Sequence, residues 1–476
     1  MSDLNDEPRI VQTDLGAKDG QNKCPKCGAT DISVNTKTGM LRCNYCRHEF
    51  QPEYIQGMET DIHNLQGEVM ASGTQDISEA SNNMMTFKCS SCGAEVVIDT
   101  SESTQARCHW CRNTLSVNQQ IPNGAVPDVV LPFKLSKKDA KAKIEDFVGR
   151  RKFFAHPKFT EEFTTENIMG VYFPYMVVDI NSHASFSGRG EHEVRHYLRG
   201  SGDHQRTYYD ADLYDVERDF DLSIKGLTVE SSSDKLNKHD NHKTNNIINA
   251  IMPFDVENSV KWDSNYLKGY SSEKRDTNVE ELRSYVDTQA KDIARFSANK
   301  SLKEYDRGVR WSSESLDVKG RQWKTAYLPV WLYSYREAKG DGEGLLHYVA
   351  VNARTQETMG SVPIHMPKLI GVSAVIEVLC FLAMLFIEFD YNFLFLLIGL
   401  IFFCVNYFRY RNTGERHHHE TETPTEIFNL RKSDRLVKRL TGLSNSKMEG
   451  ANNTNVSGTT FSENIMRNID DINPFK

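Results

Sequence analysis

The chain has 476 residues, which is long enough for several domains, and 39% of them are hydrophobic, which suffices to bury sizeable cores. The net charge of −8 disfavours a general polyanion-binding protein, because such proteins carry a positive balance. The sequence has ten cysteines, and its start does not resemble a signal peptide, so spaced cysteine pairs favour metal binding over a disulfide framework.

Residues 1–20 are polar and acidic and are predicted to be disordered, and a zinc ribbon is predicted over 21–52. The ribbon contains two Cys-x-x-Cys pairs separated by fifteen residues. Its four ligands are Cys24, Cys27, Cys43 and Cys46. Thiolates at this spacing can close a tetrahedron around one Zn²⁺, and Gly28 suits the left-handed turn after the second cysteine.

A second zinc ribbon is predicted over 85–120, because the same cysteine pattern recurs there with the same spacing. Its ligands are Cys89, Cys92, Cys108 and Cys111. Residues 53–84, between the ribbons, contain acidic residues but no Lys or Arg, and are predicted to form an acidic linker. A four-cysteine site keeps no open coordination position, so both Zn²⁺ ions are predicted to be structural.

An α+β body is predicted over 121–365, with two related lobes at about 121–245 and 246–365. "VVLPFKL" in the first lobe resembles "AIMPFDV" in the second, and "GVYFPYMVVDI" resembles "TAYLPVWLYSY", which aligns Tyr172 with Tyr327. Hydrophobic periodicity predicts helices over 139–148 and 279–296 and antiparallel strands over 186–210 and 342–359.

Residues 366–411 contain a predominantly apolar stretch from Leu369 to Phe408, which is too long for one straight membrane span. The polar turn Asp390-Tyr391-Asn392 divides it, which predicts a transmembrane helical hairpin with two spans. Basic residues flank the outer ends and acidic residues flank the turn, so both termini are predicted to be cytoplasmic. The predicted location is the cell membrane. The alternative to a membrane hairpin is a helical hairpin buried in a soluble protein.

Glu377 lies within the first predicted span, roughly level with Cys404 and Asn406, and an ionisable group at this depth is a functional-site hypothesis. The alternative is a protonated carboxyl group bonded to the partner helix or to a neighbouring subunit in a homo-oligomer. Residues 412–476 are predicted to form a basic juxtamembrane segment and a disordered tail. Within them, 426–440 is amphipathic and is predicted either to lie on anionic headgroups or to form a solvated helix.

Residues His192 to His196 match His-Glu-x-x-His, which on a helix would bind zinc with Glu193 as the general base of a metalloprotease. The flanking glycines and alternating neighbours predict a strand instead, in which residues four apart are about 13 Å apart and cannot share an ion. The sequence also lacks a Gly-Lys-Ser or Gly-Lys-Thr phosphate loop. No catalytic residue and no cofactor-binding residue is assigned, and the protein is predicted not to be an enzyme.

The chain resembles a family of bacterial membrane-attached proteins with a zinc ribbon of the transcription-factor-IIB (TFIIB) type, often labelled primosomal-helicase-like. The resemblance covers roughly 85–410 and rests on the second ribbon and on "PDVVLPFKL", "GVYFPYMVVD", "SGRG", "YLPVWLYSYR" and "HYVAVNARTQETMGSVPI". It implies a zinc-binding membrane protein, and some members are associated with toxic-anion-resistance genes. The missing phosphate loop argues against a helicase, and the first ribbon departs from the single-ribbon pattern of the family.

These features predict a membrane-anchored, non-enzymatic zinc-ribbon adaptor or regulator that binds an unknown protein partner at the cytoplasmic membrane face. The alternative is a membrane-tethered nucleic-acid-binding protein, in which Tyr45 and Trp110 would stack on bases. Side-chain charges are +3 over 23–50 and zero over 87–117, and each Zn²⁺ with four thiolates adds about −2. The resulting charges, about +1 and −2, disfavour binding to a phosphate backbone.

Overall fold

The structure of the chain is a computed structural model. It describes residues 8–11, 24–29, 31–35, 38, 40–51, 58, 61–74, 84–88, 95–99, 106–109, 114–115, 120–122, 127–164, 167–200, 206–232, 251–262, 264–267, 269–273, 275, 277–337, 345–386, 397–410 and 418–442. The helices are α1 (Lys137–Gly149), α2 (Pro157–Glu162), α4 (Val279–Asn299), α5 (Met366–Phe386), α6 (Ile398–Tyr410) and α7 (His419–Glu422), with short 3₁₀ turns η1 (Ile62–Asn64), η2 (Ser72–Thr74), η5 (Val256–Asn258) and η6 (Ser264–Leu267). The strands are β1 (Arg9–Val11), β2 (Ile32–Val34), β3 (Leu41–Cys43), β4 (Glu49–Phe50), β5 (Gly67–Ala71), β6 (Met84–Lys88), β7 (Glu95–Asp99), β8 (Ala106–Arg107), β9 (Thr114–Leu115), β10 (Gln120–Pro122), β11 (Val129–Val130), β12 (Met169–Arg199), β13 (Arg206–Glu230), β14 (Val260–Lys261), β15 (Ser271–Glu273), β16 (Gly308–Glu337), β17 (Leu345–Asn352), β18 (Thr358–Gly360) and β19 (Thr425–Gly442).

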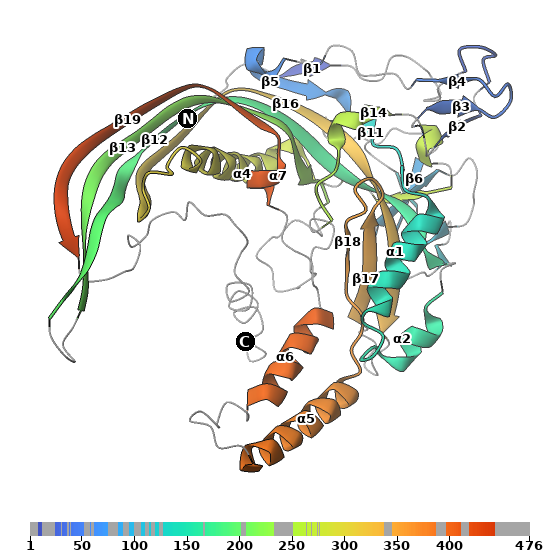
Figure 1. The fold of residues 1–476 in the computed structure, drawn as a ribbon. Helices are drawn as coiled ribbons and strands as arrows, with labels where there is room; N and C mark the ends of the chain where they lie inside the picture. Colours follow the sequence, from blue (N-terminus) through green and yellow to red (C-terminus); the bar gives the residue numbers. More distant parts are fainter. Residues whose placement is uncertain are drawn as a thin grey trace.

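Four long strands form a strongly curved antiparallel sheet that arches over α4 (Figure 1). Their spatial order is β19, β13, β12, β16; β17 pairs with the C-terminal part of β16, and β18 pairs with β17. The pairing of β12 with β16 shifts register at Gly188, where a Cβ atom would lie 2.4 Å from the carbonyl oxygen of Arg310. Only glycine permits this close approach, and such bulges help a sheet to curve. The strands predicted over 186–210 and 342–359 are confirmed: the first belong to the much longer β12 and β13, and the second are the short β17 and β18.

The concave face of the sheet is filled by α4, and the helix predicted over 279–296 is thereby confirmed. Its buried positions recur every three or four residues and include Val279, Leu282, Val286, Ala290, Ile293, Ala294 and Ala298. They pack against buried side chains of the long strands, including Val178, Phe220 and Trp323. Burying each large aliphatic or aromatic side chain contributes about 1.5–3 kcal/mol, so this contact is a main source of stability for the body.

The two halves of the body interlock in one sheet. β11 and α1 precede β12, and β15 and α4 precede β16; β11 pairs in parallel with β16, whereas β15 pairs in parallel with β12. The two Tyr-x-Pro segments lie opposite each other, because Tyr172 is paired with Pro329 and Pro174 with Tyr327. The sequence repeat therefore has a structural counterpart, but the halves are not separate lobes, and the strand that corresponds to β11 is β15 and not the matched segment 250–262.

The segment between the two cysteine sets also belongs to this body. β5 pairs in parallel with β16, and β1 pairs in parallel with β5. The buried carboxylate of Glu68 accepts hydrogen bonds from Arg283 Nη1 at 2.8 Å and from Trp323 Nε1 at 2.9 Å. The prediction of an acidic linker over 53–84 is thus wrong for the part from η1 to η2, and that of disorder over 1–20 is wrong for β1, because long-range strand pairing orders both.

α5 and α6 form an apolar pair beside the body (Figure 1). α5 is long and apolar enough to cross a membrane, and most of its candidate span is exposed. α6 has 13 residues, about 20 Å, which is shorter than the roughly 30 Å of a hydrocarbon core. The predicted turn at Asp390-Tyr391-Asn392 lies outside the described residues. One candidate span is therefore present in the described part of the chain, and the two-span hairpin stays a prediction.

Glu377 contacts α6 at its first turn. One oxygen of its carboxyl group accepts a 2.8 Å hydrogen bond from the backbone amide of Gly399. A Cβ atom at Gly399 would lie 2.5 Å from that oxygen, so glycine allows the two helices to approach. The predicted bond to the partner helix is present, but Glu377 is level with Gly399 and not with Cys404 and Asn406, because α6 begins only at Ile398.

The basic segment over 426–440 is the outer strand β19, so the prediction of a helix on headgroups or in solvent is wrong. β19 runs antiparallel to β13. Arg218, whose side chain is 1% exposed, donates to the carboxylate of Asp434 at 2.6 and 3.2 Å, and Arg439 donates to Asp212 at 2.7 and 3.0 Å. Charges that made the segment appear amphipathic therefore pair across strands.

Candidate metal centre

The first cysteine set lies on a small antiparallel sheet made of β2, β3 and β4. Two cysteines lie in the turn before β2, and two lie at the end of β3 and in the turn after it: Cys24, Cys27, Cys43 and Cys46. Both turns close in the same way, since the amides of Gly28 and Arg47 each donate at 2.8 Å to the carbonyl of the first cysteine in their pair. Both residues have positive φ angles, 72° and 59°, of which the sequence indicated only that of the glycine.

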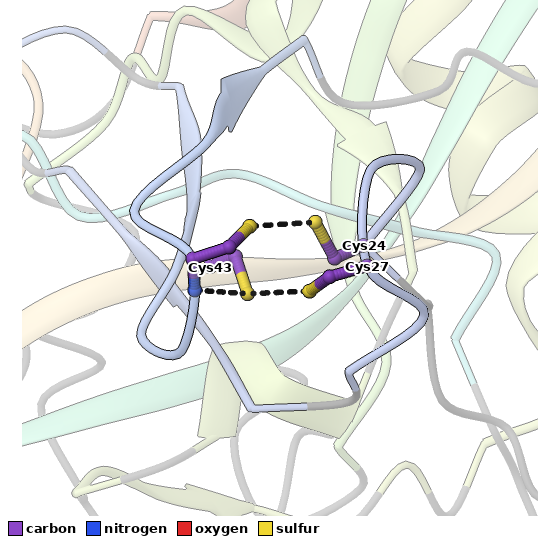
Figure 2. A group of neighbouring side chains, drawn as sticks. Cys24, Cys27 and Cys43 are labelled. Carbon is purple, nitrogen blue, oxygen red and sulfur yellow. Dashed lines mark hydrogen bonds between the residues drawn. The ribbon is translucent and has the colours of Figure 1, made fainter.

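The four sulfur atoms converge between the two turns (Figure 2). They all lie within 4.8 Å of one another, with Cys24 Sγ 3.5 Å from Cys46 Sγ and Cys27 Sγ 3.6 Å from Cys43 Sγ. Sulfur atoms on a tetrahedral Zn²⁺ with 2.3 Å bonds are about 3.8 Å apart. The predicted cysteine set therefore forms a group that could hold one metal ion.

The thiol groups of this set differ in their affinity for protons. Burial by itself raises the pKa of Cys24. Amide hydrogen bonds from Lys26 and Cys27 and the contact with Cys46 outweigh it and lower that pKa to about 7. The amide of Ala29 lowers the pKa of Cys27, yet burial and the neighbouring thiols raise it to about 12. Four thiolates this close repel one another, so full deprotonation of the set requires a bound cation.

The donor set also limits the chemistry of the site. Four cysteine sulfurs in a tetrahedral arrangement suit Zn²⁺ or iron, and they leave no coordination position for water or substrate. A metal held here would act by fixing the two turns relative to each other and not by activating a reactant.

One face of this cysteine-bearing sheet is attached to the body, and the opposite turn is exposed. Ile32 and Leu41 are 1% and 2% exposed and belong to the same core cluster as Tyr266 and Leu267 of η6. Tyr45, between the last two cysteines, is 82% exposed. The sheet is therefore fixed by its apolar face and presents the turn that carries Tyr45 to solvent.

The second predicted cysteine set is described only at Cys108, which is buried; Cys89, Cys92 and Cys111 lie outside the described residues. Two strand pairs, β6 with β7 and β8 with β9, occur in this region as a ribbon would require. β7 also pairs with β15, which joins the region to the main sheet. The second zinc site stays a prediction.

His109 attaches this region to the body, a role that the sequence did not indicate. Its Nε2 atom lies 3.0 Å from Oε1 of Glu273, with the two side chains 0% and 5% exposed, and its carbonyl oxygen accepts a hydrogen bond from Ser334. Phe173 packs edge-to-face on the imidazole ring. These partners are distant in sequence, so no local pattern could have identified the contact.

The His-Glu-x-x-His residues lie on β12, as predicted. Glu193 accepts a hydrogen bond from Arg307 at 3.1 Å and lies 3.1 Å from Nδ1 of His196, while His192 Nδ1 donates to the carbonyl of Glu304. Across the described ranges, the first cysteine set is the only group of three or more potential ligands that could hold a metal ion. This stretch does not have the helical arrangement of a metalloprotease site.

Comparisons with protein-family models, with curated proteins and with solved structures found no match for the chain, so the family resemblance drawn from its motifs stays a prediction.

Proposed function

We propose that the protein is a membrane-anchored, non-enzymatic zinc-ribbon adaptor that binds a protein partner through the turn carrying Tyr45. The observation that carries this proposal is the closed four-cysteine group beneath an 82% exposed tyrosine, on a sheet whose other face is buried against the body. An exposed aromatic side chain on a rigid support is typical of the centre of a protein interface. A closed sulfur site supports such a surface without adding chemistry.

The membrane part of the proposal is supported by α5, which is apolar along its length and mostly exposed. A helix of this kind in a soluble protein would be buried, whereas exposed residues such as Val375, Leu379 and Phe381 suit contact with lipid. We propose two spans with both termini in the cytoplasm, where cysteines stay reduced and available to a metal. A cysteine probe at position 392 should then react from outside intact cells, whereas probes near both termini should react only after permeabilisation.

Partner binding is tested with a photo-reactive phenylalanine analogue at position 45 in the full chain. Cross-linking in cells should yield a defined adduct that Cys27→Ser abolishes, because loss of one ligand should unfold the turn. The same analogue at Leu198, which is 61% exposed on β12, is the matched control and should not give this adduct. An adduct that persists in Cys27→Ser, or that forms equally from position 198, would remove the assignment of the binding surface.

A nucleic-acid partner is the second candidate, because Lys26, Arg42 and Arg47 are exposed on the same small sheet as Tyr45. Binding to a phosphate backbone weakens steeply with salt, in proportion to the number of phosphates contacted. Fluorescence anisotropy with single-stranded RNA and DNA between 50 and roughly 200 mM salt separates the candidates. Tight binding that depends steeply on salt, and that is weaker in Tyr45→Ala, would favour the nucleic-acid hypothesis.

A further inference from the structure

The loop between α1 and α2 is attached to the ends of both apolar helices. The amide of Phe154 donates to the hydroxyl of Tyr410 at 3.0 Å, and Arg151 Nε donates to the carbonyl of Arg409 at 3.0 Å, both at the end of α6. At the start of α5, Lys368 Nζ donates to the carbonyl of Phe153 at 2.6 Å. The loop is therefore fixed at the level where the apolar helices meet the body.

Positive charge gathers on this loop and on the adjoining helix ends. Lys152, Lys368 and Arg409 are exposed, and no carboxylate in the described part of the chain forms an ion pair with any of them. Arg150, by contrast, is already paired with Asp146 at 2.5 Å. Within the described residues, Lys152 and Arg409 thus carry charges without an acidic partner, and Lys368, which donates one hydrogen bond to Phe153, keeps further donors for an external anion.

Arg151 adds a buried cation beneath this surface. Its guanidinium group packs over the ring of Phe147, with 3.7 Å between the central carbon and the ring centroid, and Nη1 donates to the carbonyl of the same residue. Burial, and then the positive charge of Arg409, lower the pKa of Arg151 to about 10. Like charges held near each other in this way repel, and an anion between them and the solvent would relieve the repulsion.

Phe153 projects from the centre of the same loop. Its side chain is 62% exposed, and the ammonium group of Lys368 lies 4.1 Å from the ring centroid. An exposed phenyl ring beside cations, next to the first turn of an apolar helix, is the arrangement found at a membrane interface, where rings lie at the boundary between headgroups and acyl chains.

We propose that this loop, with Lys152, Lys368 and Arg409, binds the phosphate groups of anionic phospholipids and inserts Phe153 at the membrane interface. The inference rests on the proposed membrane attachment. It also replaces the headgroup contact that was one of the two alternatives for 426–440, since that segment is a strand of the sheet. The basic residues proposed here lie next to the ends of the apolar helices.

The test is binding of phosphatidylglycerol and phosphatidylcholine to the full chain in detergent, measured by native mass spectrometry. Each basic residue near an anionic surface contributes roughly fivefold in affinity, so Lys152→Gln with Lys368→Gln should lower the affinity for phosphatidylglycerol about 25-fold. The matched control is Lys141→Gln with Lys300→Gln, which removes one half-buried lysine paired with Glu145 and one lysine that lies over a phenylalanine ring. It should leave the affinity unchanged.

An unchanged preference for phosphatidylglycerol in the first double variant, or an equal loss in the control, would overturn the proposal. If inorganic phosphate at the same concentration as the phosphatidylglycerol displaced the lipid, the assignment to lipid would be overturned. Carbonate extraction of cell membranes tests attachment separately. Release of the wild-type chain would reject the proposed membrane anchor, whereas a retained chain without the lipid preference would reject this inference alone.

Discussion

The buried pair between Arg218 and Asp434 allows a direct test of β19. Asp434→Ala removes two hydrogen bonds from a guanidinium group whose side chain is 1% exposed and leaves it Ser301 Oγ and the carbonyl of Glu217. Removing one partner of a buried ion pair costs about 3–5 kcal/mol. The side chain of Asp434 is 28% exposed, so water can reach the gap, and we expect a smaller loss of about 2 kcal/mol in the local stability of the strand.

That loss corresponds to a roughly 30-fold increase in local opening. Hydrogen–deuterium exchange of the full chain would measure it as lost amide protection over 430–440. Asp215→Ala is the matched control, because it breaks a pair with Arg189 in which both side chains are about half exposed, and should change protection less than about fivefold. Equal effects of the two variants, or an unprotected segment in the wild-type chain, would refute the strand assignment.

The hydrogen bond to Asp221, with a smaller contribution from Asp219, raises the pKa of His183 against the effect of burial. The protonated histidine therefore stabilises the fold fully below its ordinary pKa of about 6.5, and this stabilisation is lost as pH rises through the raised pKa. Exchange protection of β13 should fall over that pH range in the wild-type chain and should be independent of pH in His183→Gln. Gly399→Ala places a Cβ atom 2.5 Å from Glu377 and should lower the midpoint of thermal unfolding in detergent, whereas Gly371→Ala, which meets nothing within 4 Å, should not; equal midpoints would contradict the close helix contact. Glu193→Gln should leave any peptide hydrolysis unchanged, and hydrolysis that depends on Glu193 would reinstate the metalloprotease.

The parts of the fold that the sequence predicted are those specified locally. Cys24 and Cys46 are brought together by two short turns and a hairpin, so their spacing is enough to predict the group. α4 has an apolar face whose residues recur every three or four positions within one continuous segment. Local patterns of this kind are readable because the partners lie within a few turns of each other.

The parts that the sequence did not predict depend on distant partners. β19 has apolar and basic residues at intervals that fit a helix, and only pairing with β13, about two hundred residues earlier, makes it a strand. β5 is short and lies in a stretch without Lys or Arg, yet Glu68 is ordered by Arg283 and Trp323 from the opposite half of the chain. His109 and Glu273 show the same dependence at the second cysteine region. Tertiary context decides such segments.

Zinc content tests the central claim most directly, since the proposed binding surface depends on the metal at the first cysteine set. The full chain purified without chelators should contain about two Zn²⁺, and Cys108→Ser should retain about one, held by Cys24, Cys27, Cys43 and Cys46. Adding Cys27→Ser should remove that ion as well. A Cys108→Ser chain that is folded, as judged by exchange protection of α4, but contains no metal would contradict the account.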